Sequence, residues 1–98
     1  MSIQILDRAE DDLVAGYWFY EQQEPGVGAY FLDTLYSDIE SLVLYAGIHS
    51  ISHGDFYRML SKRFPYAIYY KTSEAEVFVH AVLDCRRDPV WTQLRLET

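Results

Sequence analysis

The sequence predicts an α+β fold in which a helical hairpin packs on one face of a small antiparallel sheet. Apolar residues recur at three- and four-residue spacing through residues 9–46, which is typical of amphipathic helices. Three runs rich in Tyr, Ile, Phe and Val follow in residues 56–83, as expected of strands. The chain has 98 residues, so we expect one domain over residues 1–98 with the element order β-α-α-β-β-β.

A short strand and a helix are expected at the start of the chain. Residues 2–6 are assigned to the strand, where Ile3 and Ile5 are apolar. Asp7 is expected to cap a helix that runs to about residue 22, and Glu10 completes a capping-box pattern. The spacing predicts a buried face of Ala9, Leu13, Gly16, Tyr17 and Tyr20.

A second helix is expected over residues 28–46, after the break at Pro25-Gly26. Its apolar stripe is predicted to comprise Phe31, Leu35, Ile39, Leu42, Val43 and Ala46. The opposite side is predicted to carry Asp33, Asp38, Glu40 and Ser41. The short connection makes the two helices antiparallel neighbours, and residues 48–54 are expected to form a loop.

Three strands are expected at residues 56–60, 66–71 and 76–83. The turns between them are short, which favours antiparallel pairing. Asp88-Pro89 ends the last strand, and residues 90–96 are expected to form a short helix or tail.

Composition narrows the class of protein. The sequence has no apolar run long enough to span a membrane and no signal-peptide pattern, so a cytoplasmic protein without membrane attachment is expected. The single cysteine, Cys85, fits a reducing compartment. No metal-ligand, phosphate-loop or nucleophile motif is present, so no cofactor or metal is expected.

The net charge of −7 divides unevenly along the chain. Residues 1–55 hold ten carboxylates and one base, whereas residues 56–98 hold five acids and seven bases. The second half is therefore expected to meet an acidic partner, which the first half would repel.

Basic residues of the second half are expected to gather on one side of the sheet. The candidate target contacts are Arg58, Lys62, Arg63, Arg86, Arg87, Trp91 and Arg95. Guanidinium groups suit phosphate contacts, and an aromatic ring such as that of Trp91 suits base stacking. In the alternative interpretation, Arg58 and Arg87 pair with acids of this same chain.

A set of short motifs extends over nearly the whole sequence. In chain order these are Ala9 with Asp12-Leu13, Tyr20-Glu21, Pro25-Gly26-Val27-Gly28, Phe31-Leu32, Arg63-Phe64-Pro65-Tyr66-Ala67-Ile68-Tyr69-Tyr70, Ala81-Val82-Leu83 and Arg86-Arg87-Asp88-Pro89-Val90-Trp91. Together they resemble the RelE/ParE superfamily of small bacterial toxins, in its ParE-like plasmid-stabilisation branch. The resemblance implies that the N-terminal strand joins the sheet edge. It also implies that the chain is the toxin of a type II toxin–antitoxin system.

Two activities are associated with the superfamily that this sequence resembles. RelE-type members cut messenger RNA on the ribosome, for which Arg58, Arg86 and Arg87 are the candidate residues here. Leu60 and Ala67 stand at positions that are basic in the ribonucleases.

Trp91 lies nearest the position of the catalytic tyrosine and has no acid–base function. This incomplete set favours a non-enzymatic inhibitor of ParE type, with DNA gyrase as the candidate target. A ribosome-dependent ribonuclease and a non-toxic interaction module remain the alternatives.

The resemblance also implies a cognate antitoxin that forms a hetero-oligomer with this chain. Candidate antitoxin contacts are the aromatic residues off the core stripes, namely Trp18, Phe19, Tyr30 and Tyr36. The sequence leaves open the target, toxicity itself, the identity of the antitoxin and the oligomeric state. It also assigns no role to His49, His53 or His80.

Overall fold

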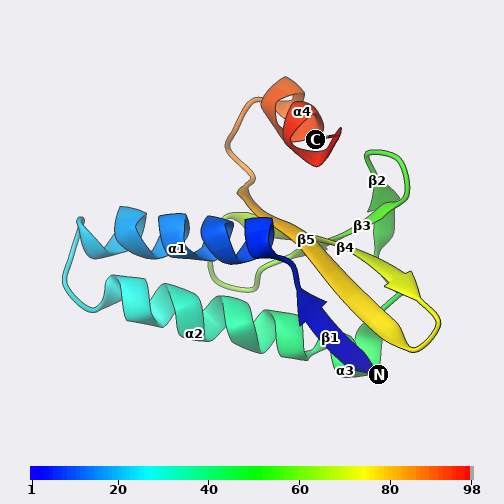
Figure 1. Ribbon diagram of the computed structural model, residues 1–98. Helices are drawn as coiled ribbons and strands as arrows, with labels where there is room; N and C mark the ends of the chain where they lie inside the picture. The colour runs from blue at the N-terminus through cyan, green and yellow to red at the C-terminus, as the bar shows by residue number, and fades with distance from the viewer. Residues whose placement is uncertain (98) are drawn as a thin grey trace.

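The computed structural model describes residues 1–97 (Figure 1). Its elements, in chain order, are β1 (Ser2–Ile5), α1 (Asp7–Glu21), α2 (Val27–Glu40), α3 (Leu42–Tyr45), β2 (Ser50–Ser52), β3 (Phe56–Leu60), β4 (Tyr66–Ser73), β5 (Glu76–Asp84) and α4 (Pro89–Glu97). The α+β fold expected from the sequence is confirmed. Within these residues, no helix is long and apolar enough to cross a membrane.

The five strands form one mixed sheet in the order β1-β5-β4-β3-β2. Strands β2 to β5 pair antiparallel through short turns. Strand β1 runs parallel to β5, with Ser2 opposite Glu76 and Ile5 opposite Val79. The helical hairpin between β1 and the rest of the sheet supplies the long connection that parallel pairing requires.

The expectation of a loop over residues 48–54 was wrong, because this segment contains β2. Ser50 pairs with Arg58 and Ser52 with Phe56 across a tight turn. His53 and Gly54 in that turn have positive φ angles of 51° and 80°, a backbone conformation that suits hairpin turns. The preceding segment is anchored by the hydroxyl of Tyr70, which accepts the Gly47 N–H at 3.0 Å.

Helices cover both faces of the sheet. In Figure 1, α1 and α2 lie side by side, and α4 lies across the sheet from α2. The larger core fills the side of α1 and α2 and includes Ala9, Leu13, Phe31, Leu35, Ile39, Leu42, Ile68, Tyr70, Val77, Val79 and Val82. The smaller core lies under α4 and comprises Phe56, Ala67, Tyr69, Ala81 and Leu83, with Trp91 and Leu96 packed against it.

Two details of the predicted helices require correction. Leu6, not Asp7, is the N-cap of α1, and no side chain caps the helix; Asp7 lies in its first turn. The second helix does not run unbroken to residue 46, because α2 ends at Glu40 and α3 is a separate turn of helix. This break leaves Val43 47% exposed, so it is not part of the predicted stripe.

Asp38 was expected on the solvent side of α2, but it is only 5% exposed. Its carboxylate accepts the Ser61 hydroxyl at 2.6 Å and the Lys62 N–H at 3.3 Å. A buried carboxylate needs such donors, and they come from the turn between β3 and β4. Asp38 therefore fixes that turn against α2, which a helical periodicity alone does not reveal.

The two long helices approach closely at Gly16. A Cβ atom at this position would lie 2.4 Å from Cζ of the Phe31 ring, so only glycine fits. At the far end of α1, the Glu21 carboxylate accepts the N–H groups of Gly26 and Gly28 at 3.0 Å. Glu21 thereby binds the first N–H groups of α2, as an acid at a helix N-terminus does.

Asp12 connects three elements of the fold. Strand β5 continues past the end of β1, so part of its edge has no partner strand. Asp12 of α1 accepts the Val82 N–H at that edge at 3.0 Å. The same carboxylate oxygen forms an ion pair with Arg95 of α4 at 2.6 Å, and both side chains are largely buried.

We expect Asp12→Ala to lower the free energy of unfolding by about 2–3 kcal/mol, because it removes the carboxylate partner of the largely buried Arg95 guanidinium and the acceptor of the Val82 N–H. Asp12→Asn should cost less, since its amide oxygen still accepts the Val82 N–H. Urea denaturation monitors both variants, and a double-mutant cycle with Arg95→Met isolates the ion pair. The matched control is Asp11→Asn on the exposed side of α1, expected within about 0.5 kcal/mol of the wild type. Equal stability of Asp12→Ala and this control would contradict the assignment.

Candidate functional site

A cavity of about 280 Å³ opens between the sheet and the start of α4. It is lined by Ser52, His53, Arg58, Tyr69, Cys85, Arg87, Pro89 and Thr92. Two of the predicted basic residues, Arg58 and Arg87, therefore reach one cavity from different elements. We call this space the arginine cavity.

Arg58 is held in the arginine cavity by the neighbouring strands. It projects from β3, and its Nε donates to the Tyr69 hydroxyl at 3.2 Å. One Nη atom also lies 3.6 Å from the Cys85 sulfur. The hydrogen bond to Tyr69 raises the pKa of Arg58, so the side chain stays cationic. None of the ion pairs among residues 1–97 involves Arg58. Its guanidinium is therefore a fixed positive charge without a carboxylate partner at the cavity wall.

Arg87 is placed by an aromatic ring. Its guanidinium lies 4.1 Å from the centroid of the Trp91 ring, in cation–π contact. The sequence alternative in which Arg58 and Arg87 pair with acids is thus not what the described residues adopt. Trp91, a predicted base-stacking residue, has this face of its ring occupied by Arg87.

Arg86 is not among the residues that line the arginine cavity. Its guanidinium forms a two-pronged pair with Asp84, at 2.9 and 2.8 Å, and lies 6.0 Å from the Phe19 ring of α1. Hydrogen bonding from Arg86 lowers the pKa of the Asp84 carboxyl. The two adjacent arginines thus serve different surfaces, which the sequence did not distinguish.

The remaining predicted target contacts lie elsewhere. Lys62 and Arg63 are exposed on the turn between β3 and β4. Arg95 is engaged by Asp12 in the largely buried ion pair described above. The structure therefore brings together Arg58, Arg87 and Trp91, and not the full basic set.

A second groove, of about 370 Å³, runs beside the unpaired edge of β5. It is lined by Asp12, Ala15, Gly16, Phe19, Tyr66, Val82, Leu83, Asp84, Arg87 and Trp91. Because Arg87 also lines the arginine cavity, the two spaces adjoin at this residue. We call this second space the edge groove.

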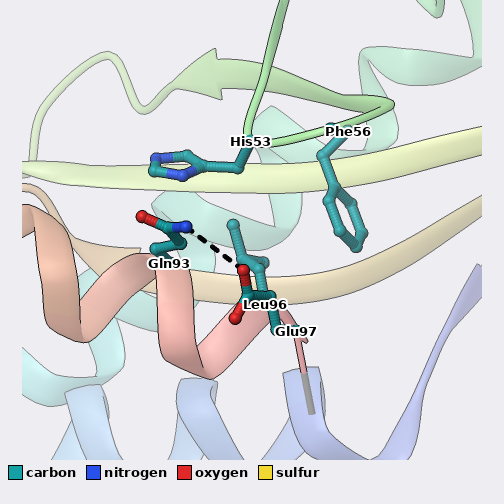
Figure 2. A pocket seen from close by; sticks show the side chains of 6 residues that line it. His53, Phe56, Gln93, Leu96 and Glu97 are labelled. Atoms are coloured by element: carbon teal, nitrogen blue, oxygen red, sulfur yellow. Dashed lines mark hydrogen bonds between the residues drawn. The ribbon is translucent and has the colours of Figure 1, made fainter.

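His53 is a site residue to which the sequence assigned no role. It lines the arginine cavity and also a neighbouring space of about 320 Å³ under α4. Figure 2 shows its imidazole ring lying beside Gln93, with the Phe56 ring directed toward Leu96. The sequence signal that could have indicated its position is the turn-forming pair His53-Gly54. The centroid of the imidazole ring lies 6.1 Å from that of the Tyr69 ring of β4.

The other two histidines are separate from the arginine cavity. His80 lines a smaller space with Arg95, and burial lowers its pKa. His49 contacts the hydroxyl of Tyr70, and burial lowers its pKa as well. Among residues 1–97, no three His, Cys, Asp or Glu side chains gather so that they could hold a metal ion.

The candidate antitoxin contacts occupy several surfaces of the helical hairpin. Trp18 is 55% exposed and packs edge-on against Tyr17. Tyr30 contacts Phe64, which lies in the β3–β4 turn. Phe19 lines the edge groove.

The last of these candidates is only partly accessible. Tyr36 is half-buried and donates a hydrogen bond to Glu10 of α1 at 3.0 Å. Among these four candidates, Tyr36 is the one that bridges α2 and α1 by a side-chain hydrogen bond.

Comparison with known proteins supports the fold. No protein-family model matches the sequence, and no curated protein matches it either. A chain of the solved structure described as "Chromosomal ParDE TA system from P. aeruginosa" is similar, with a TM-score of 0.74 and 16% sequence identity. The similarity covers 84% of this chain and 92% of that chain. At this identity the likeness shows a shared fold, which is the fold that the sequence resemblance implies.

The Arg58–Cys85 contact makes a testable prediction about thiol reactivity. Although the residue is exposed, partial burial of its thiol raises the pKa of Cys85, while Arg58 acts in the opposite direction. Because the thiolate is the reactive form, we expect slow alkylation at pH 8 and a rate that increases toward more alkaline pH. Arg58→Met should move the midpoint of the pH–rate profile higher still.

Iodoacetamide labelling followed by mass spectrometry measures this profile. Arg63→Met, an exposed arginine on the β3–β4 turn, is the matched control and should leave the midpoint unchanged. A midpoint that falls in Arg58→Met would show that the guanidinium does not act on the thiol.

Proposed function

We propose that this chain is the toxin of a type II toxin–antitoxin system and acts by binding an essential target. The observation that carries the proposal is the fold shared with a chain of a ParDE toxin–antitoxin structure over most of both chains. DNA gyrase is the candidate target. The proposal places the protein in the cytoplasm, in a hetero-oligomer with its antitoxin.

The chemistry of the arginine cavity favours binding over catalysis. Arg58 and Arg87 supply fixed positive charge, and Tyr69 supplies a hydroxyl. In-line cleavage of RNA also needs a general base and a proton donor for the leaving oxygen. Leu60 is an exposed apolar residue and Ala67 is fully buried, so neither supplies such a group.

A ribosome-dependent ribonuclease is the second candidate function, and one observation favours it. His53 lines the arginine cavity together with Arg58 and Arg87, so an imidazole and two cations share one space. Histidine is a frequent general base near neutral pH. This arrangement gives the ribonuclease alternative a testable catalytic set, with His53 in place of the basic strand residues.

The antitoxin in this proposal contacts the helical hairpin. Exposed or half-exposed aromatic rings at Trp18, Phe19, Tyr30 and Tyr36 are its candidate contacts. Arg58, Arg87 and Trp91 remain the grouped target candidates, with Lys62, Arg63 and Arg86 on neighbouring surfaces.

The first prediction concerns the process that this chain inhibits. Inducing the chain alone in bacteria should lower incorporation of labelled thymidine within minutes, before incorporation of labelled methionine falls. Such an order would fit a gyrase-type inhibitor. An earlier fall in methionine incorporation would favour the ribonuclease, and no fall in either, with soluble folded protein present, would contradict the toxin proposal.

The second prediction separates binding from catalysis within the arginine cavity. If the chain binds its target there, Arg58→Ala and Arg87→Ala should abolish growth inhibition, whereas His53→Gln should retain it. If the chain is a ribonuclease, His53→Gln should also abolish both inhibition and cleavage of messenger RNA, by about 100-fold or more. Arg63→Ala, a candidate outside the arginine cavity, should retain inhibition if the target binds in the cavity alone, and circular dichroism establishes that each variant is folded.

A further inference from the structure

The longest stretch of the sequence without Asp, Glu, Lys or Arg is residues 41–54, in a chain whose net charge is −7. It contains α3, the connection that follows and strand β2. The hydroxyl of Tyr70, from the larger core, accepts the Gly47 N–H at 3.0 Å and contacts Nδ1 of His49. These contacts hold the segment in place at one end of the sheet. We call residues 41–54 the charge-free segment.

The charge-free segment exposes large apolar side chains to solvent. Ile48 and Ile51 are 72% and 61% exposed. Tyr45 and Ile48 line a hollow of about 320 Å³ together with Leu60, the last residue of β3. Single exposed apolar residues are common, whereas a group of them usually marks an interface. We call the group of Tyr45, Ile48, Ile51 and Leu60 the apolar corner.

Strand β2 forms an outer edge of the sheet and carries none of the usual protection. It ends the strand order, so β3 is the strand that pairs with it. Exposed edges are usually blocked by charged side chains, a proline or a covering element. Where β5 extends beyond β1 on the other side of the sheet, Asp12 caps the Val82 N–H. Strand β2, by contrast, is Ser50-Ile51-Ser52, and its outer backbone groups are available to another strand.

We propose that two copies of this chain associate through β2 and the apolar corner. A two-fold axis brings residues near the axis close to their own copies, so charged residues there would repel each other. An antiparallel pair of Ser50-Ile51-Ser52 strands has no such repulsion and would bury Ile51. Surfaces on α1 and α2 suit a second copy less, because they carry exposed acids. A partner recognised by its charge would find no opposite charge in this segment.

The charged residues that border the apolar corner are compatible with this association. The carboxylate of Asp38 lines the same hollow as Lys62, but it already accepts hydrogen bonds from the β3–β4 turn. Arg58 pairs with Ser50 through the backbone, and its side chain lines the arginine cavity. The contacts nearest the two-fold axis would therefore be made by apolar and hydroxyl groups.

The proposed pairing has a consequence for the arginine cavity. Ser52 of β2 lines that cavity together with Arg58. Antiparallel pairing about a two-fold axis perpendicular to the sheet leaves the same face of both sheets on one side. The two arginine cavities would then open on one face of a continuous sheet, on either side of the axis, and a target could contact both. This inference goes beyond the proposed function and does not depend on it.

Analytical ultracentrifugation of the purified full chain tests the association. We expect a monomer–dimer equilibrium, and Ile51→Lys should weaken the dimer at least about tenfold, because two like charges would meet at the axis. Val14→Lys is the matched control, since it places the same charge on an exposed apolar residue of α1, and it should leave the dimer unchanged. A wild-type chain that stays monomeric at about 100 μM would overturn the proposal, as would equal weakening by both substitutions.

Cross-linking locates the contact without a change of charge, and circular dichroism establishes that each variant is folded. In a Cys85→Ser background, Ile51→Cys places a thiol at the proposed axis, and Val14→Cys places one on α1. A short bis-maleimide should join two Ile51→Cys chains and leave Val14→Cys chains separate. The reverse result, or no cross-linked dimer from either variant, would overturn the proposal.

An antitoxin strand is the alternative occupant of this edge, and it gives a different result. The wild-type chain would then be monomeric alone, and Ile51→Lys would prevent co-purification of the protein encoded directly upstream. That outcome would assign β2 to this partner and overturn the proposal. Failure of the toxin proposal is distinct, because it would appear as harmless induction of the chain alone and would leave the ultracentrifugation result unchanged.

Discussion

The edge of β5 that β1 leaves unpaired is the constraint on which the arrangement of this protein depends. A buried strand N–H needs an acceptor, and Asp12 supplies it to Val82 from α1. Burial raises the pKa of Asp12, and both this N–H and Arg95 act against that rise. The carboxylate is therefore held in a position where it needs two donors, and one of them comes from α4. In this way a gap in strand pairing fixes a helix on the opposite face of the sheet.

The position of α4 in turn creates the candidate site. Trp91 and Leu96 pack over the smaller core, and Arg87 lies against the Trp91 ring. Arg58 meets this region from β3 through the Tyr69 hydroxyl. The arginine cavity thus lies between a sheet whose strands are fixed by backbone pairing and a helix fixed by few contacts. The distance between the Arg58 and Arg87 guanidinium groups therefore depends on both the sheet and α4.

Much of the fold could be predicted from the sequence, because helical and strand periodicities are local. The stripe from Phe31 to Leu42 and the three β-rich runs were predicted correctly for this reason. Strand β2 was missed because three residues carry too short a pattern, and pairing with β3 decides their conformation. The burial of Asp38 depends on donors from a distant turn, which spacing along one helix does not contain. The sequence predicted Arg58 and Arg87 only as members of a larger basic set. It could not show that Arg86 leaves this set by pairing with its neighbour Asp84.

The separation of charge along the sequence becomes a separation between two sides of the molecule. The exposed acids Asp7, Asp11, Asp33 and Glu40 lie on α1 and α2, whereas the arginine cavity lies across the sheet beside the start of α4. Under the proposed function, an antitoxin confined to α1 and α2 would leave Arg58 and Arg87 open to the target. To neutralise the toxin, the antitoxin would then need a second contact near the arginine cavity. The edge groove connects the two regions, because its lining extends from α1 along β5 to Arg87. Its floor is the same unpaired strand edge that Asp12 caps, so an added strand would have to pair beyond Val82, toward Asp84.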